Sequence, residues 1–70
     1  MELNETLETN FKYHPPTQEK QDKYVALRET AKSLAYLITD LCPESRERSI
    51  AVTGLEASIM WANASIARNP

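Results

Sequence analysis

Apolar residues in the second half of the chain recur with the three- and four-residue spacing of one helix face. The stripe consists of Val52, Leu55, Ile59, Ala62 and Ile66. Positions with this spacing share one side of an α-helix, so the stripe needs a partner surface. Pro43 suits a first helical turn and Arg68 complements the negative end of the helix dipole. The pattern therefore predicts a helix over residues 43–68.

A second run with helical spacing comes earlier in the chain and contains no Gly or Pro until Pro43. Its apolar positions are Tyr24, Leu27, Ala31, Leu34, Ile38 and Leu41. Thr17 is a suitable N-cap, which predicts a helix over residues 17–41. The short break at residues 40–44 would return the second helix against the first. The sequence thus predicts an all-α fold, an antiparallel two-helix hairpin.

The first sixteen residues form a polar arm followed by an aromatic and proline-rich loop. Leu3 and Leu7 permit one or two helical turns. Pro15 and Pro16 favour extended or turn geometry, which keeps the loop aromatics out of a helix. We expect residues 1–70 to form one domain with an N-terminal arm or short helix and no internal repeat.

Small size and excess apolar surface both favour a homo-oligomer. In a chain of 70 residues, the apolar area buried on folding does little more than offset the conformational entropy cost of about 1.5 kcal/mol per ordered residue. Its single cysteine, Cys42, excludes an internal disulfide, and one His with one Cys disfavours an internal zinc site. Further apolar and small residues on the second helix also exceed what one neighbour could cover: Ile50, Gly54, Ala57, Met60, Trp61, Ala64 and Ala67.

Charge and hydropathy exclude several classes of partner. Eight basic against ten acidic residues give a formal net charge of −2. That balance disfavours a binder of long DNA or RNA, although a local basic cluster can still hold a small anion. We also expect no signal peptide, no membrane-spanning segment and a reducing, cytosolic setting.

Catalytic chemistry has few candidate groups here. His14 stands alone in its loop, the chain has a single glycine and there is no phosphate-cradling motif. Cys42 fits a capping or buried role better than that of a nucleophile. We therefore expect no enzyme, no cofactor and no metal site.

Binding chemistry is better represented, in the aromatic loop and the basic residues of the first helix. Aromatic rings can stack on bases, while Lys and Arg bind phosphate oxygens. Those basic residues are Lys20, Lys23, Arg28 and Lys32. Two structural alternatives remain open: a solvated charged face, and aromatics that staple the arm to the hairpin. Asn63, amid alanines, is expected to face either a specific hydrogen-bond partner or solvent.

Two strings, FKYHPPTQEKQDKYVALRETAKSLAYLI and LCPESRERSIAVTGLEASIMWANASIAR, resemble the type 2 anti-CBASS sponge family of phage proteins. The resemblance covers residues 11–68 and is most specific in the Tyr13-His14-Pro15 loop, the Cys42-Pro43 turn and residues 60–63. It implies a helical hairpin that assembles as a homohexamer in the cytoplasm of the infected bacterial host. There it would sequester cyclic di- and trinucleotide messengers without cleaving them, which blocks the CBASS defence.

The same resemblance implies roles for individual residues. Tyr13 would stack on a base of a 3',3'-cGAMP-like cyclic dinucleotide, and Arg28 would bind phosphate where the family more commonly has lysine. Lys32 would add to the same positive field. Weaker candidates for a second pocket at a protomer junction are His14, Asn63 and Arg68. An alternative from the apolar faces alone is a hairpin that docks on a host protein as an adaptor or inhibitor.

Overall fold

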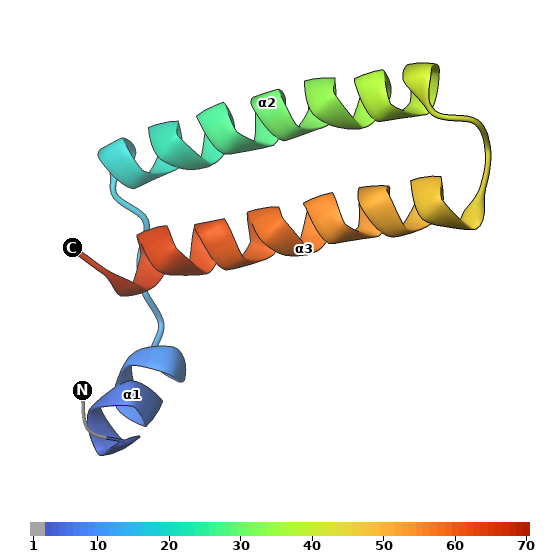
Figure 1. Cartoon of the computed structure of the whole chain (residues 1–70). Coiled ribbons are helices and arrows are strands. Elements are labelled where there is room, and N and C mark those ends of the chain that lie inside the picture. The colour runs from blue at the N-terminus through green and yellow to red at the C-terminus, as the bar shows by residue number, and fades with distance from the viewer. Residues whose placement is uncertain (1–2) are drawn as a thin grey trace.

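The computed structural model describes residues 3–70, which form three helices and no strand. They are α1 (Leu3–Asn10), α2 (Gln18–Leu41) and α3 (Arg46–Arg68). Figure 1 shows α2 and α3 lying side by side and antiparallel, with α1 set apart near the open end of the hairpin. The predicted all-α hairpin is confirmed, and the predicted arm contains a short helix.

The two long helices begin at hydroxyl caps of the same design. The Thr17 hydroxyl accepts the backbone N–H of Lys20 at 3.2 Å, as the sequence predicted. The Ser45 hydroxyl accepts the backbone N–H of Arg48 at 3.1 Å. Because the Ser45 hydroxyl accepts this backbone N–H of the first helical turn, α3 begins at Arg46, which is three residues later than predicted. Pro43 lies in the turn before the helix. The break falls at residues 42–45, two residues beyond the start that the sequence indicated.

The seam between α2 and α3 follows one half-buried face of each helix. On α3 the whole predicted stripe is half-buried. On α2 the half-buried positions are Lys20, Tyr24, Leu27, Ala31, Ala35 and Ile38. Leu34 and Leu41, which the sequence placed in this seam, are exposed, and Ala35 lies there instead. A strict seven-residue repeat drifts around a straight helix, so a four-residue step after Ala31 keeps the seam facing α3.

Two basic side chains close the ends of the hairpin. Lys20 Nζ donates to the backbone carbonyls of Ala67 and Asn69, at 3.5 and 3.2 Å. Arg48 Nη1 donates to those of Thr39 and Cys42, at 3.4 and 3.2 Å. Cys42 itself is exposed and caps α2, its N–H donating to the Ile38 carbonyl. The open carbonyls at each helix end thereby gain a cationic partner.

The hairpin has no interior of its own. No residue between 3 and 70 is fully buried. The accessible area is 5836 Å², against about 4,450 Å² for a compact protein of 8.0 kDa. The radius of gyration is 15.4 Å, compared with about 11 Å for a compact chain of this length. A single layer of helices explains both excesses.

The length and apolar composition of α3 bear on the expectation of no membrane-spanning segment. Arg46–Arg68 is long and apolar enough to cross a membrane by length and composition, with a mean hydropathy of 1.2 in its best window. By length and composition, the expectation that no segment could span a membrane is therefore wrong for α3. Here the helix lies with its stripe against α2, and Glu56 stands near its middle.

Candidate functional site

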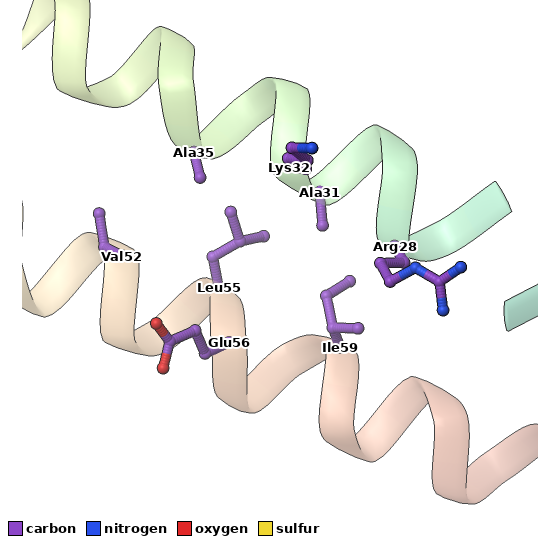
Figure 2. Close-up of a pocket in the computed structure, with 8 residues that line it drawn as sticks. All are labelled: Arg28, Ala31, Lys32, Ala35, Val52, Leu55, Glu56 and Ile59. Carbon is purple, nitrogen blue, oxygen red and sulfur yellow. The ribbon is translucent and has the colours of Figure 1, made fainter. Parts of the chain in front are cut away.

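A groove runs along the hairpin where the two helices face each other. It measures about 400 Å³ and is lined by Arg28, Ala31, Lys32, Ala35, Val52, Leu55, Glu56 and Ile59. Figure 2 shows the alanines of α2 and the aliphatic side chains of α3 pointing toward one another, with Arg28 and Lys32 on the α2 side. The groove therefore combines an apolar floor with two cations along one edge and one carboxylate on the other helix.

Arg28 and Lys32 are the basic residues of α2 that remain available to a ligand. Arg28 contacts only its neighbour Glu29 among the charges of residues 3–70, with Nε 3.9 Å from Oε1 and its side chain 65% exposed. Lys32 has no ion pair within the same range. One helical turn separates them, so their charges add at one place along the groove. Such a pair can hold one or two phosphate groups.

The other two basic candidates of α2 are engaged within the chain. Lys20 binds the carbonyls at the end of α3. Lys23 pairs with Glu19 one turn before it, at 3.3 Å. Of these four basic residues, Lys20 and Lys23 therefore bind partners within the chain. Arg28 and Lys32 line the groove.

The aromatic loop lies away from these cations. Tyr13 is 79% exposed and is not among the residues that line the groove. Arg28 lies eleven positions beyond the N-cap Thr17, about 16 Å along α2. The loop runs from α1 past the open end of the hairpin rather than toward the middle of α2 (Figure 1). One chain therefore does not unite Tyr13 with Arg28.

His14 has a local partner in the arm. Its Nε2 is 2.6 Å from the carbonyl oxygen of Thr9, and both residues are half-buried. This contact folds the loop back on the end of α1 and fixes the direction in which Tyr13 leaves it. His14 serves there as an anchor of the loop.

The side-chain oxygen of Asn63 faces neither a hydrogen-bond partner nor solvent, the two surroundings that the sequence led us to expect. Its side-chain Oδ1 is buried and has no hydrogen-bond partner within residues 3–70. A buried acceptor without a donor costs about 1–3 kcal/mol. The Oδ1 atom of Asn63 therefore keeps an unused capacity to accept a hydrogen bond.

Arg68 belongs to a separate surface at the C-terminal end of α3. It lines a hollow of about 250 Å³ with Ala57, Met60, Trp61 and Ala64. Trp61 is 70% exposed there. The structure therefore keeps Arg28 with Lys32 in one place, and Arg68 beside an exposed aromatic ring in another.

Glu56 is the groove residue that sequence reasoning missed. It stands four residues after Val52 and one after Leu55, so it borders the predicted stripe. That spacing was a usable signal. Its carboxylate lines the same groove as Arg28 and Lys32 without an ion pair to either of them. A bound anion would meet its negative charge.

No group of three or more His, Cys, Asp or Glu side chains that could hold a metal ion occurs within residues 3–70. The polar chemistry of the groove is instead that of two basic side chains and one carboxylate.

Comparison with known proteins identifies a family. A family model described as Acb2/Tad1, hairpin domain, matches residues 3–67, which is nearly the whole chain. No curated protein and no solved structure matches the chain significantly.

Proposed function

The chain belongs to the Acb2/Tad1 hairpin family, as its resemblance to the type 2 anti-CBASS sponges indicated, and from this we propose that it sequesters cyclic oligonucleotides. Its ligands would be cyclic di- and trinucleotide messengers, held without cleavage so that CBASS effectors stay inactive. The site of action would be the cytoplasm of the infected bacterial host. Family membership supports this proposal, and the Arg28–Lys32 groove is the observation that carries it.

The groove suits the two halves of such a ligand. Its aliphatic floor of Val52, Leu55 and Ile59 offers apolar surface to a base, and burying that surface contributes roughly 25 cal/mol per Å². Arg28 and Lys32 would neutralise the phosphates. Arginine presents a planar fork, so Arg28 favours bidentate contact with phosphate oxygens. The formal charge of −2 opposes long nucleic acids, but a short cyclic ligand responds mainly to this local field.

A second chain is needed to complete the proposed site. The single layer has no buried residue within 3–70, and Tyr13 is not among the residues that line the groove with Arg28. Tyr13 of one protomer would then stack on a base whose phosphate is held by Arg28 of another. We propose a homo-oligomer, a hexamer by analogy with the family, with His14, Asn63 and Arg68 at protomer junctions.

The proposed activity is stoichiometric binding rather than turnover. Holding a ligand requires affinity and abundance, and it does not require a nucleophile or general base. A heat-denatured complex should therefore release its cyclic nucleotide intact on chromatography. Recovery of linear products would instead make the protein a phosphodiesterase.

The central test is thermal melting with a panel of cyclic di- and trinucleotides. A ligand that binds only the folded state stabilises it by about 2.7 kcal/mol at 100 times its dissociation constant. Arg28→Ala and Tyr13→Ala should lose most of this shift while keeping the assembly. Lys23→Ala removes the same charge from the same helix outside the groove and should retain it. If no cyclic nucleotide in the panel raised the melting temperature of the folded, unsubstituted protein, the proposal would be overturned.

The exposed hollow around Trp61, Met60 and Arg68 favours one alternative function, a hairpin that docks on a host protein. Large aromatic and Arg side chains are the residue types that dominate such interfaces. A monomer whose melting temperature does not change with any cyclic nucleotide would favour this second function.

A further inference from the structure

Glu56 is a charged side chain of the groove that has no partner within the described chain. It is exposed, and its carboxylate makes no hydrogen bond or ion pair with residues 3–70. Arg28 and Lys32 line the same groove, but neither of them pairs with it. Both carboxylate oxygens are therefore free to accept hydrogen bonds from a ligand.

A carboxylate in this place opposes the binding of phosphate. Like charges repel, and one exposed charge changes the affinity for an anion by roughly twofold to fivefold. The carboxylate holds no other residue in position that could account for its presence in the groove. Glu56 therefore weakens the binding of a nucleotide unless another part of that nucleotide donates hydrogen bonds to it.

The surfaces of the groove follow the order in which a nucleotide presents its own parts. Figure 2 shows Arg28 and Lys32 on the α2 side and Glu56 on the α3 side. Leu55 and Ile59 point into the space between the two helices. The groove volume of about 400 Å³ is in the usual range for a small-molecule site. A nucleotide with its phosphate on the cations and its base on the aliphatic side chains would turn the far edge of that base toward the carboxylate.

Guanine is the base whose Watson–Crick edge best matches a carboxylate. It presents two adjacent donors, N1–H and the 2-amino group, and the two carboxylate oxygens can accept both at once. Adenine and cytosine each present an amino donor beside a ring nitrogen that is an acceptor. Uracil presents one N–H between two carbonyl oxygens. In these three bases an acceptor faces one of the carboxylate oxygens and is repelled by it.

We propose that Glu56 is a specificity-determining residue that accepts hydrogen bonds from the Watson–Crick edge of guanine, so that the groove selects guanine-containing cyclic oligonucleotides. This inference rests on the proposed function, because it assigns the base of the same bound ligand. A good bidentate contact discriminates between bases by about 5- to 150-fold. Because Glu56 is exposed to solvent, we expect the lower end of that range.

Calorimetric titration with three ligands of equal charge and ring size tests the assignment. The ligands are the 3',3'-cyclic dinucleotides that contain only guanine, only hypoxanthine or only adenine as their base. Hypoxanthine keeps the N1–H of guanine but lacks the 2-amino group, so it removes one of the two donors. Each ligand is titrated into the unsubstituted protein, into Glu56→Gln and into Glu47→Gln. The last is the matched control, because it makes the same charge change in the first turn of α3, outside the groove.

The readout is the dissociation constant of the adenine ligand divided by that of the guanine ligand. We expect this ratio to fall about fivefold in Glu56→Gln and to stay unchanged in Glu47→Gln. Loss of a negative charge favours all three ligands alike, so the charge effect cancels in the ratio. The hypoxanthine ligand should bind the unsubstituted protein more weakly than the guanine ligand does. An unchanged ratio in Glu56→Gln, or equal affinity for the guanine and hypoxanthine ligands, would overturn the role of Glu56.

The outcome is separable from the proposed function. Ligands that bind the folded protein with the same ratio in Glu56→Gln would overturn the reading of guanine and leave the sponge function standing. If neither these three ligands nor any other cyclic nucleotide bound the folded protein, the sponge function itself would be overturned, and the role of Glu56 with it.

Discussion

Lys20 and Arg48 occupy equivalent places at opposite ends of the hairpin. Each is the third residue of its helix, and each donates its backbone N–H to the capping hydroxyl of that helix. Each side chain then reaches across to the last carbonyls of the other helix. This reciprocal arrangement holds the ends of α2 and α3 in a fixed register, which keeps the two sides of the groove opposite each other.

Removing either cross-helix contact should destabilise the hairpin. Lys20→Met and Arg48→Met keep most of the aliphatic length but lose the hydrogen bonds, and each should lower the free energy of unfolding by about 1 kcal/mol. Denaturant unfolding measures the change. Lys23→Met is the matched control, because its exposed pair with Glu19 is worth at most a few tenths of a kcal/mol. Equal losses in all three variants would contradict a special role for the helix ends.

Removing the groove carboxylate should strengthen anion binding. Glu56 lines the groove with Arg28 and Lys32, so its charge opposes that of a phosphate. Glu56→Gln should tighten the binding of a cyclic nucleotide without guanine by roughly twofold to fivefold, the effect of one exposed charge. Calorimetric titration at low salt is the measurement. Glu47→Gln makes the same charge change in the first turn of α3 and should have a smaller effect.

Filling the position of Gly54 should separate helix stability from assembly. A Cβ placed on Gly54 meets no atom within 4 Å in the single chain. Alanine should therefore add about 1 kcal/mol to the stability of α3. If another protomer's helix packs closely at Gly54, Gly54→Ala should also promote dissociation on dilution in sedimentation experiments. Higher stability with unchanged assembly would show that this face is open.

Replacing the buried amide should distinguish a structural defect from a ligand contact. Asn63 Oδ1 has no partner within the described residues. Asn63→Leu removes this unsatisfied acceptor and should raise the melting temperature of the ligand-free protein, by an amount equivalent to about 1 kcal/mol. The same change should abolish added stabilisation by any ligand that donates to Asn63. A variant that keeps the full ligand-induced shift would exclude that contact.

The sequence by itself determined the two long helices and their pairing, and it left open whether the arm is helical. Unbroken helical spacing from Gln18 to Leu41, the Thr17 cap and the proline-containing turn were sufficient for the hairpin, because these signals act locally. The spacing from Val52 to Ile66 also identified the face that α3 presents to α2. Arg28 and Lys32 were candidates from charge and resemblance, and they share the groove.

Only the tertiary structure decided which residues meet. A strict repeat placed Leu34 and Leu41 in the seam, whereas the straight geometry of packed helices brings Ala35 there. Local signals could not show that Lys20 donates to carbonyls at the C-terminal end of α3, because these partners lie 47 and 49 residues away in the chain. Nor could they reveal that Glu56 shares the groove with the cations, or that the leucine side of α1 faces away from its own hairpin. Such contacts depend on how distant segments are oriented in space, which sequence spacing alone does not specify.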